Sequence, residues 1–324
     1  MSVRYGSRSR PGTMVSTWLN SLVSGTAPPG RAGYFGGGNT GSTVDTVESF
    51  GFPSDTRSTL VATLSAARYS LVGFANSGTA GYFAGGNGST VVDKLSFADD
   101  TMSALGTGMS SNWYNAAGFA NSGTAGYVAG GIEADAGGRT DAVEKFTFSD
   151  DSRSTLGAVL TNTVDQPAGM ANSGTAGYVA GGEYWSAGSV FVTTVDKFAF
   201  PADSKSTLGT GLSAATMKLA GMANSGTAGY FGGGTTGSTV ATVDKFDFSD
   251  DSRSTLGTGL SAATYDLAGM ADSGTAGYFG GGYTASRVTT VDKFDFSDDS
   301  RSTLGTGLAT ATWRLAAFAN TSGL

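Results

Sequence analysis

The sequence predicts an all-β protein made of six repeated units, each built from four short antiparallel strands. The motif Gly-Tyr-(Phe/Val)-(Gly/Ala)-Gly-Gly recurs at intervals of 45 to 52 residues, a period that fits four strands with their turns. Every unit also divides into strand-length segments separated by Gly, Asn and Ser clusters. No part of the chain supports a long helix. The tyrosines of the motif are Tyr34, Tyr82, Tyr127, Tyr178, Tyr230 and Tyr278.

The fifth unit shows the strand pattern. It reads LAGMAN, a turn at SGT, AGYFGGG, a loop, TVDKFDF, a turn at SDDSRS, and TLGTGL. Phe246 and Phe248 alternate onto one face of the third strand. The first two strands consist mainly of Ala and Gly, as expected for wedge-shaped sheets that converge on an axis. We therefore predict a six-bladed β-propeller of four-stranded antiparallel blades.

The two ends of the repeat region predict how the ring closes. The chain enters the first unit at its second strand, residues 32–38, and finishes with an unpartnered first strand, LAAFAN, at residues 315–320. We expect this C-terminal strand to complete the first blade, which leaves no open sheet edge. The propeller then spans residues 31–324, and residues 1–30 form an N-terminal tail. The tail is either a disordered extension or a segment that docks onto other proteins, and the sequence does not decide between the two.

The repeat resembles two known groups of proteins. A Gly-Gly pair that ends an apolar strand, followed by an aromatic strand and a turn, resembles the kelch type of β-propeller. Kelch units usually carry a Trp after the third-strand turn, where this chain has Leu60, Leu156 and Leu256 among others. The phrases SGTAGY and SDDSRSTLGTGL resemble Gly-rich repeat proteins of tailed bacteriophages, including those that infect cyanobacteria. This second resemblance implies a virion protein, and kelch proteins of the cell imply a cytoplasmic alternative.

Composition excludes several functional classes. The chain has no His and no Cys, which removes Ser-His-Asp triads, thiolate catalysis and the common transition-metal sites. A copper site like that of galactose oxidase, known on kelch propellers, lacks its ligands. The net charge of −7, without any Lys/Arg cluster in the repeats, argues against nucleic-acid binding. No apolar run is long enough to cross a membrane. We expect no enzyme activity, no cofactor and no metal.

The loops fall on two faces of the predicted propeller. In an antiparallel blade the second-to-third and fourth-to-first connections lie on the same face, and there the units diverge while the framework stays alike. Aromatic and basic residues gather in these loops, although the scaffold does not require them. They are Arg68, Tyr69, Trp113, Tyr114, Lys218, Tyr265, Trp313 and Arg314 in the fourth-to-first connections, and Tyr184, Trp185, Tyr283 and Arg287 in the second-to-third loops.

These twelve residues are the predicted ligand-binding residues. Tyr and Trp offer a large contact area at low entropic cost and stack on sugar rings or pack against partner proteins. The alternative is that individual aromatics fill gaps between blades. Gaps between similar blades would call for similar residues, so this alternative explains the group less well.

On the opposite face an Asp recurs three residues after a third-strand Phe. The surrounding phrase Ser-Asp-Asp-Ser-Arg-Ser-Thr-Leu resembles the Asp-box of sialidase propellers. We expect the Asp to accept backbone N–H bonds within its own turn; calcium binding and catalysis are the alternatives. The six are Asp55, Asp100, Asp151, Asp203, Asp251 and Asp299.

Three functions are compatible with the sequence. The first is a virion-associated structural or adhesion protein of a tailed phage, in a tail fibre, neck or capsid decoration. It would bind a host-surface glycan or another virion protein through the divergent aromatic face, and contact virion proteins through residues 1–30. The second is a cellular kelch-type interaction scaffold. The third is a glycan hydrolase that uses Glu133, Asp135 or Glu183, but no two of these can be placed at the separation that catalysis needs.

Overall fold

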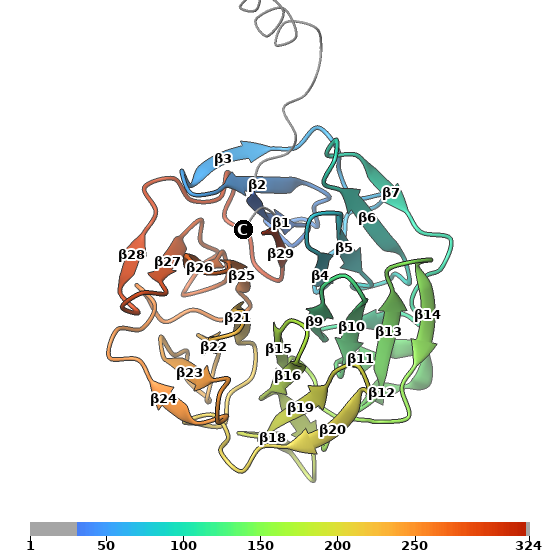
Figure 1. Cartoon of the computed structure of the whole chain (residues 1–324), viewed down its shortest axis with the longest axis vertical. Coiled ribbons are helices and arrows are strands. Elements are labelled where there is room, and N and C mark those ends of the chain that lie inside the picture. The colour runs from blue at the N-terminus through green and yellow to red at the C-terminus, as the bar shows by residue number, and fades with distance from the viewer. Residues whose placement is uncertain (1–30, 322–324) are drawn as a thin grey trace, which may run out of the picture.

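The computed structural model describes residues 31–321, and in this range the protein is built almost entirely of antiparallel β-sheet. Six sheets have four strands, one has three and one has two. The four-stranded sheets lie around a common centre (Figure 1). The prediction of an all-β protein is confirmed. The predicted tail, residues 1–30, lies outside the described residues, as do residues 322–324.

The four-stranded sheets follow one topology, in which the strands pair in the order of the chain, with β11 and β12 of unit III and β17 and β18 of unit IV left out of the sheet. Sheet I is the exception because its first strand comes from the C-terminal end. The sheets are I (β29-β1-β2-β3), II (β4-β5-β6-β7), III (β9-β10-β13-β14), IV (β15-β16-β19-β20), V (β21-β22-β23-β24) and VI (β25-β26-β27-β28).

The first strand of each sheet lies nearest the centre in Figure 1. These strands are β29 (Ala316–Asn320), β4 (Val72–Asn76), β9 (Ala117–Asn121), β15 (Ala168–Asn172), β21 (Ala220–Asn224) and β25 (Ala268–Asp272). The second strands are β1 (Ala32–Gly36), β5 (Ala80–Ala84), β10 (Ala125–Ala129), β16 (Ala176–Ala180), β22 (Ala228–Gly232) and β26 (Ala276–Gly280).

The third and fourth strands complete each sheet toward the rim. The third strands are β2 (Val47–Gly51), β6 (Val92–Ser96), β13 (Val143–Thr147), β19 (Val195–Ala199), β23 (Val243–Asp247) and β27 (Val291–Asp295). The fourth strands are β3 (Thr56–Thr59), β7 (Met102–Ala104), β14 (Ser152–Thr155), β20 (Ser204–Thr207), β24 (Arg253–Thr255) and β28 (Arg301–Thr303).

Sheets III and IV carry extra strands in their second-to-third loops, and sheet III has one more, β8, in the connection that enters it. Next to sheet III, β8 (Trp113–Tyr114), β11 (Ile132–Glu133) and β12 (Gly138–Arg139) form the three-stranded sheet, with a 3₁₀ turn η1 (Ala134–Ala136). Next to sheet IV, β17 (Glu183–Trp185) and β18 (Ser189–Phe191) form a hairpin. No helix in residues 31–321 is long and apolar enough to span a membrane.

Strand β29 pairs with β1 along its whole length, from Ala316 opposite Gly36 to Asn320 opposite Ala32. The central Tyr34–Phe318 pair packs ring against ring at a centroid distance of 5.6 Å. Sheet I therefore joins residues from both ends of the described chain.

Six backbone hydrogen bonds form a cycle around the centre. The donor of each bond is the N–H of the residue two positions before a first strand. The acceptor is the carbonyl of the equivalent residue of the preceding sheet, at 2.8 to 3.1 Å. Arg314 donates to Asp266, and Ser70 of sheet II donates to Arg314, so the cycle returns to its start. All six residues have positive φ, between 53° and 60°. We call them the axial ring: Ser70, Asn115, Gln166, Lys218, Asp266 and Arg314.

Glycines at the second position of the innermost strands let neighbouring strands approach backbone to backbone. A Cβ on Gly118 would overlap the carbonyl oxygen of Gly73, and a Cβ on Gly169 would overlap that of Gly118. The same relation links Gly221 to Gly169 and Gly269 to Gly221. Sheet I has Ala317 at this position. The close approach of six strands at one centre thus requires Gly or Ala at the second position of each first strand.

Neighbouring sheets are also joined farther out by a repeated contact that we call the tyrosine clasp. The motif tyrosine of one sheet stacks on the Phe that directly follows the third strand of the next sheet, at centroid distances of 5.3 to 5.4 Å. Its hydroxyl donates to the recurring Asp of that next sheet at 2.7 to 3.3 Å. In five clasps a Lys adds an ion pair to the same Asp at 2.6 to 2.7 Å.

The tyrosine clasp corrects the role expected for the recurring Asp. Asp151, for example, accepts from Tyr82 and Lys94 of the neighbouring sheet and so joins two sheets. The turn is capped instead by the preceding residue, as Asp150 accepts the backbone N–H of Ser152. Within residues 31–321 no group of three or more Asp or Glu side chains is arranged to hold a metal ion.

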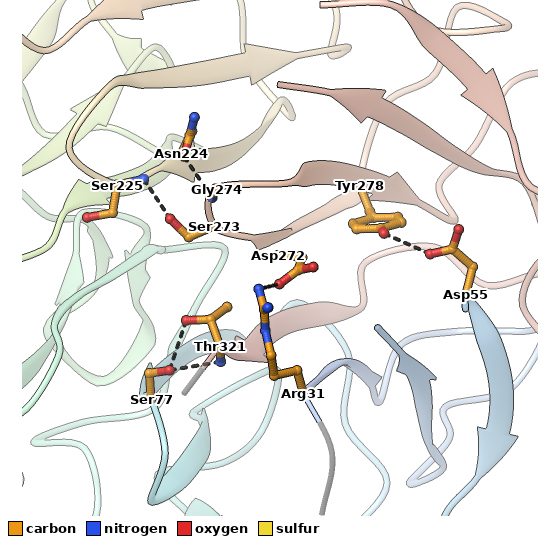
Figure 2. A network of polar contacts seen from close by, with 10 residues as sticks. All are labelled: Arg31, Asp55, Ser77, Asn224, Ser225, Asp272, Ser273, Gly274, Tyr278 and Thr321. Carbon is orange, nitrogen blue, oxygen red and sulfur yellow. Dashed lines mark hydrogen bonds and ion pairs between the residues drawn. The ribbon is translucent and has the colours of Figure 1, made fainter. Parts of the chain in front are cut away.

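The face opposite the axial ring carries a second, incomplete set of repeated contacts (Figure 2). An Asn at the end of one first strand accepts from a turn glycine of the next sheet, as Asn224 does from Gly274 at 2.8 Å. In sheet VI the Asn is replaced by Asp272, which forms an ion pair with Arg31. An ion pair thus replaces the amide contact where the two ends of the described chain meet.

Adding a side chain to the glycine positions should destabilise the protein. Gly169→Val places three carbons against the backbone of β9, and we expect a loss of roughly 2–3 kcal/mol of unfolding free energy from overpacking. Ala317→Gly, the reverse change at the equivalent position of sheet I, should cost no more than about 1 kcal/mol. Urea unfolding followed by circular dichroism measures both. Equal effects of the two changes would contradict the close-approach argument.

The clasp between sheets I and II lacks its lysine, because Ser49 occupies that position, and its Tyr34–Asp100 bond is the longest of the six at 3.3 Å. Ser49→Lys should therefore stabilise the protein by about 0.5–1 kcal/mol through a new ion pair with Asp100. Burial raises the pKa of Asp100, which is consistent with its missing cation. In an Asp100→Asn background the same substitution should bring no gain, and a gain that persists there would show that the lysine acts elsewhere.

Candidate functional site

The connection that enters each sheet contributes three consecutive variable residues to the face of the axial ring. The first is buried, the second packs over the second-to-third loop of the same sheet, and the third belongs to the axial ring. The first residues, at the buried position, are Arg68, Trp113, Val164, Thr216, Thr264 and Thr312. The second residues, at the middle position, are Tyr69, Tyr114, Asp165, Met217, Tyr265 and Trp313.

Isolated β-bridges fix the middle position against the neighbouring loop. Trp313 bridges Asn39, and Tyr265 bridges Tyr283, which in turn bridges Arg287. These short backbone pairings hold the aromatic side chains side by side on a rigid base.

Three aromatic side chains from sheets VI and I form one cluster. The ring centroids of Tyr265 and Tyr283 lie 5.4 Å apart, and those of Tyr283 and Trp313 lie 5.2 Å apart. The Arg287 guanidinium lies 6.0 Å from the Trp313 ring, and that of Arg314 lies 4.5 Å from it. We call these five residues the Trp313 cluster.

Further cations and rings extend the cluster into an arc. Lys218 lies over the Tyr265 ring at 5.1 Å, and Arg314 lies 5.8 Å from the Tyr69 ring. Such cation–π contacts contribute about 0.5–1 kcal/mol each at partly exposed sites. Arg314 is held in place because its Nε donates to Asp266 at 3.0 Å. The arc therefore offers aromatic faces bordered by positive charge.

Two N–H groups of the cluster have no partner within the described chain. Both the indole Nε1 of Trp313 and the guanidinium Nε of Arg287 are buried and unbonded. Trp113, by contrast, donates its indole N–H to the carbonyl oxygen of Gly130.

The side chains of the axial ring surround a small cavity of about 80 Å³. A second cavity of about 110 Å³ shares Leu71, Ala116, Pro167 and equivalent residues with it and is lined by the innermost strands. Ser70 is only 6 % exposed, and its hydroxyl has no partner in residues 31–321. Cavities of this size with polar walls suit a few water molecules rather than a sugar ring.

Burial sets the acidity of the carboxyl groups near the ring. Desolvation raises the pKa of Asp266, against the opposing effects of Arg314 and Lys218. It also raises the pKa of Asp165, although the Asn115 side chain donates to that carboxylate at 3.0 Å.

The structure divides the twelve predicted site residues into three groups. Seven come together in the arc: Tyr69, Lys218, Tyr265, Tyr283, Arg287, Trp313 and Arg314. Arg68 and Trp113 are each only 1 % exposed and belong to the interior. Of the two, only Trp113 is aromatic and packs in a core cluster with residues of sheets II and III, as the gap-filling alternative describes. Tyr114, Tyr184 and Trp185 lie outside the cluster, in the small sheets next to sheets III and IV; Trp185 is 66 % exposed on the β17–β18 hairpin.

The site-residue prediction omitted three uncharged residues of the axial ring and Asp266, which positions Arg314. A signal for them was present, because six units place six different residue types at one repeat position, directly before Leu, Ala or Pro. The uncharged three are Ser70, Asn115 and Gln166.

Comparison with known proteins does not place this site in a family. No protein-family model matches the chain, and no curated protein matches it in sequence. The interpretation of the site therefore depends on its own chemistry.

Asp266 should make a measurable, pH-dependent contribution to stability. Its folded-state pKa lies above the ordinary value of 3.8, so the stability that its protonated form contributes is lost as the pH rises through the raised pKa. Asp266→Asn keeps an oxygen for Arg314 but does not titrate. The unfolding free energy of the variant minus that of the wild type should therefore increase from about pH 4 to pH 7. A constant or falling difference in urea titrations would refute the assignment.

Proposed function

We propose that the chain is a closed six-bladed kelch-like β-propeller that acts as a non-enzymatic, virion-associated binding protein of a tailed phage. In this proposal it attaches to a host-surface glycan through the Trp313 cluster. The observation that carries the proposal is the Trp313 cluster itself, in which three aromatic rings and two guanidinium groups meet on the face where the six units diverge.

The axial ring and the clasps support the propeller. The backbone cycle passes through all six sheets and returns from Arg314 to Ser70. The clasp from sheet VI to sheet I, between Tyr278 and Asp55 at 2.7 Å, has the geometry of those between neighbouring units. Together with the β29–β1 pairing, these contacts favour six blades closed by the C-terminal strand.

The chemistry of the arc favours a sugar. Flat aromatic faces pack against the C–H side of a pyranose ring. The guanidinium groups of Arg287 and Arg314 can donate hydrogen bonds to hydroxyl or carboxylate oxygens. Because Lys218, Arg287 and Arg314 supply positive charge and Asp266 is paired, the site is best suited to a glycan that carries acidic groups.

The candidate carboxylates of a hydrolase have structural partners. Asp135 accepts the backbone N–H of Asn112 at 2.9 Å, and Glu183 forms an ion pair with Arg139 at 2.8 Å. Glu183 is also buried. These roles account for both residues without catalysis and support a binding function.

The virion location depends on the phage-like repeat phrases, and the predicted docking segment, residues 1–30, is the proposed contact with other virion proteins. A cellular kelch-type scaffold in the cytoplasm is the alternative. Cofractionation of the native protein with phage particles would support the virion location, and its recovery in host cytosolic complexes would favour the scaffold.

A glycan array tests the binding proposal. We expect the purified chain to bind acidic glycans saturably. Trp313→Ala combined with Tyr283→Ala should weaken this binding by about 1,000-fold, since hot-spot aromatics contribute about 2 kcal/mol each and every 1.4 kcal/mol is about tenfold in affinity. Circular dichroism of the variant checks that the fold is retained.

Trp185→Ala is the matched control, because Trp185 is an exposed tryptophan outside the cluster. It should leave glycan binding unchanged. If Trp185→Ala abolishes binding and the double variant does not, the ligand site lies on the β17–β18 hairpin. If no glycan binds, the proposal is wrong.

A further inference from the structure

A repeated pocket lies beneath the connection that enters each sheet, under the buried position. Two sheets fill it with a long side chain of their own. In sheet II, Arg68 donates from Nη1 to the carbonyl oxygens of Gly85 and Val91, both at 2.7 Å, and pairs through Nη2 with Asp93. In sheet III, Trp113 donates to the carbonyl of Gly130, which corresponds to Gly85. The pocket thus presents carbonyl acceptors and a carboxylate.

In sheet I the same pocket is lined by the same set of groups but has no long side chain. It has a volume of about 180 Å³ and is lined by Gly37, Thr46 and Glu48, the equivalents of Gly85, Val91 and Asp93. Thr312 stands where Arg68 stands in sheet II, and its hydroxyl donates to the carbonyl of Thr310 instead.

The carboxylate of this pocket is the least well partnered of its kind. In sheet V, Asp244 accepts from the Ser213 backbone and hydroxyl and from Thr255, at 2.6 to 2.8 Å. Glu48 accepts only the backbone N–H of Ala309, at 2.9 and 3.1 Å, since Ala309 lacks the serine hydroxyl. Its cation, Arg57, lies 3.9 Å away, whereas Arg153 lies 2.6 Å from the equivalent Glu144 of sheet III.

The pocket can be reached from solvent. Residues on its rim, including Thr46, Thr59 and Thr310, are exposed, whereas Glu48 at its base is only 9 % exposed. Burial also raises the pKa of Glu48, which shows that its charge is incompletely compensated. A cation that enters this pocket loses its contacts with water and gains contacts with the Glu48 carboxylate and with the backbone carbonyls of Gly37 and Thr46.

We propose that the pocket around Glu48 is a receptor for the guanidinium group of an arginine on a partner protein. Sheet II shows how such a group would bind. There Arg68 fills the equivalent pocket and donates to two backbone carbonyls and a carboxylate. A guanidinium can donate to the carboxylate and to both carbonyls at once, whereas an ammonium is a point charge without this planar fork. This inference does not depend on glycan binding, since the two sites share no residue.

The test uses the full chain and N-acetyl-L-argininamide as the probe, with N-acetyl-L-lysinamide for comparison. Chemical shifts of the Gly37, Thr46 and Glu48 amides are followed during the titration. We expect saturable binding of the arginine compound and at least about tenfold weaker binding of the lysine compound. Glu48→Gln should weaken arginine binding by about tenfold or more, because the charge-assisted bond is lost.

Thr312→Arg is the decisive variant, because it supplies the arginine from within as sheet II does. It should raise the melting temperature and abolish binding of the probe. If the probe does not bind the wild type, or still binds Thr312→Arg at the same amides, the proposal is overturned. In the reverse change, Arg68→Thr should create a second binding event at Gly85 and Asp93 or, if the variant is destabilised, show a rise in melting temperature with added probe.

Discussion

The close approach of six strands at one centre is the constraint on which the rest of the structure depends. Strands that meet backbone to backbone leave little room for a side chain at the point of contact, so the second position of each innermost strand is Gly or Ala. The same crowding brings the axial ring within hydrogen-bonding distance across sheets. Because the backbone alone makes those bonds, the side chains of the axial ring are free to differ from unit to unit. This face can therefore diverge while the framework remains the same.

Much of the fold was predictable because it repeats. The period, the four strands of each unit and the place of the last strand follow from six aligned copies of one pattern. The clasps were not predictable from the same pattern, since Tyr82 and Asp151 lie in different units and a single unit shows only that each residue recurs. A recurring Asp can accept hydrogen bonds from its own turn or from a neighbouring sheet. Only the relative placement of two sheets distinguishes these possibilities.

The site was predicted in part for a related reason. Consecutive residues of an irregular connection have no fixed period, so the sequence does not tell which of Arg68 and Tyr69 points inward. The structure buries the first and exposes part of the second. One feature of the sequence does indicate that Arg68 points inward. Sheet II has Met102 where other sheets have a fourth-strand cation near the buried acid, and Arg68 supplies the missing charge from the opposite side.

The pairing of β29 with β1 has a consequence for the order in which the molecule is assembled. Sheet II can form from residues 72–104 alone, whereas sheet I needs residues 32–59 together with residues 316–320. Contacts between residues so far apart in the chain carry the largest loop-closure entropy and form slowly. The other five sheets reduce that cost as they stack, because each one brings the two ends nearer. Sheet I is therefore the last of the six four-stranded sheets to form, and it cannot be completed before residues 316–320 have been synthesised.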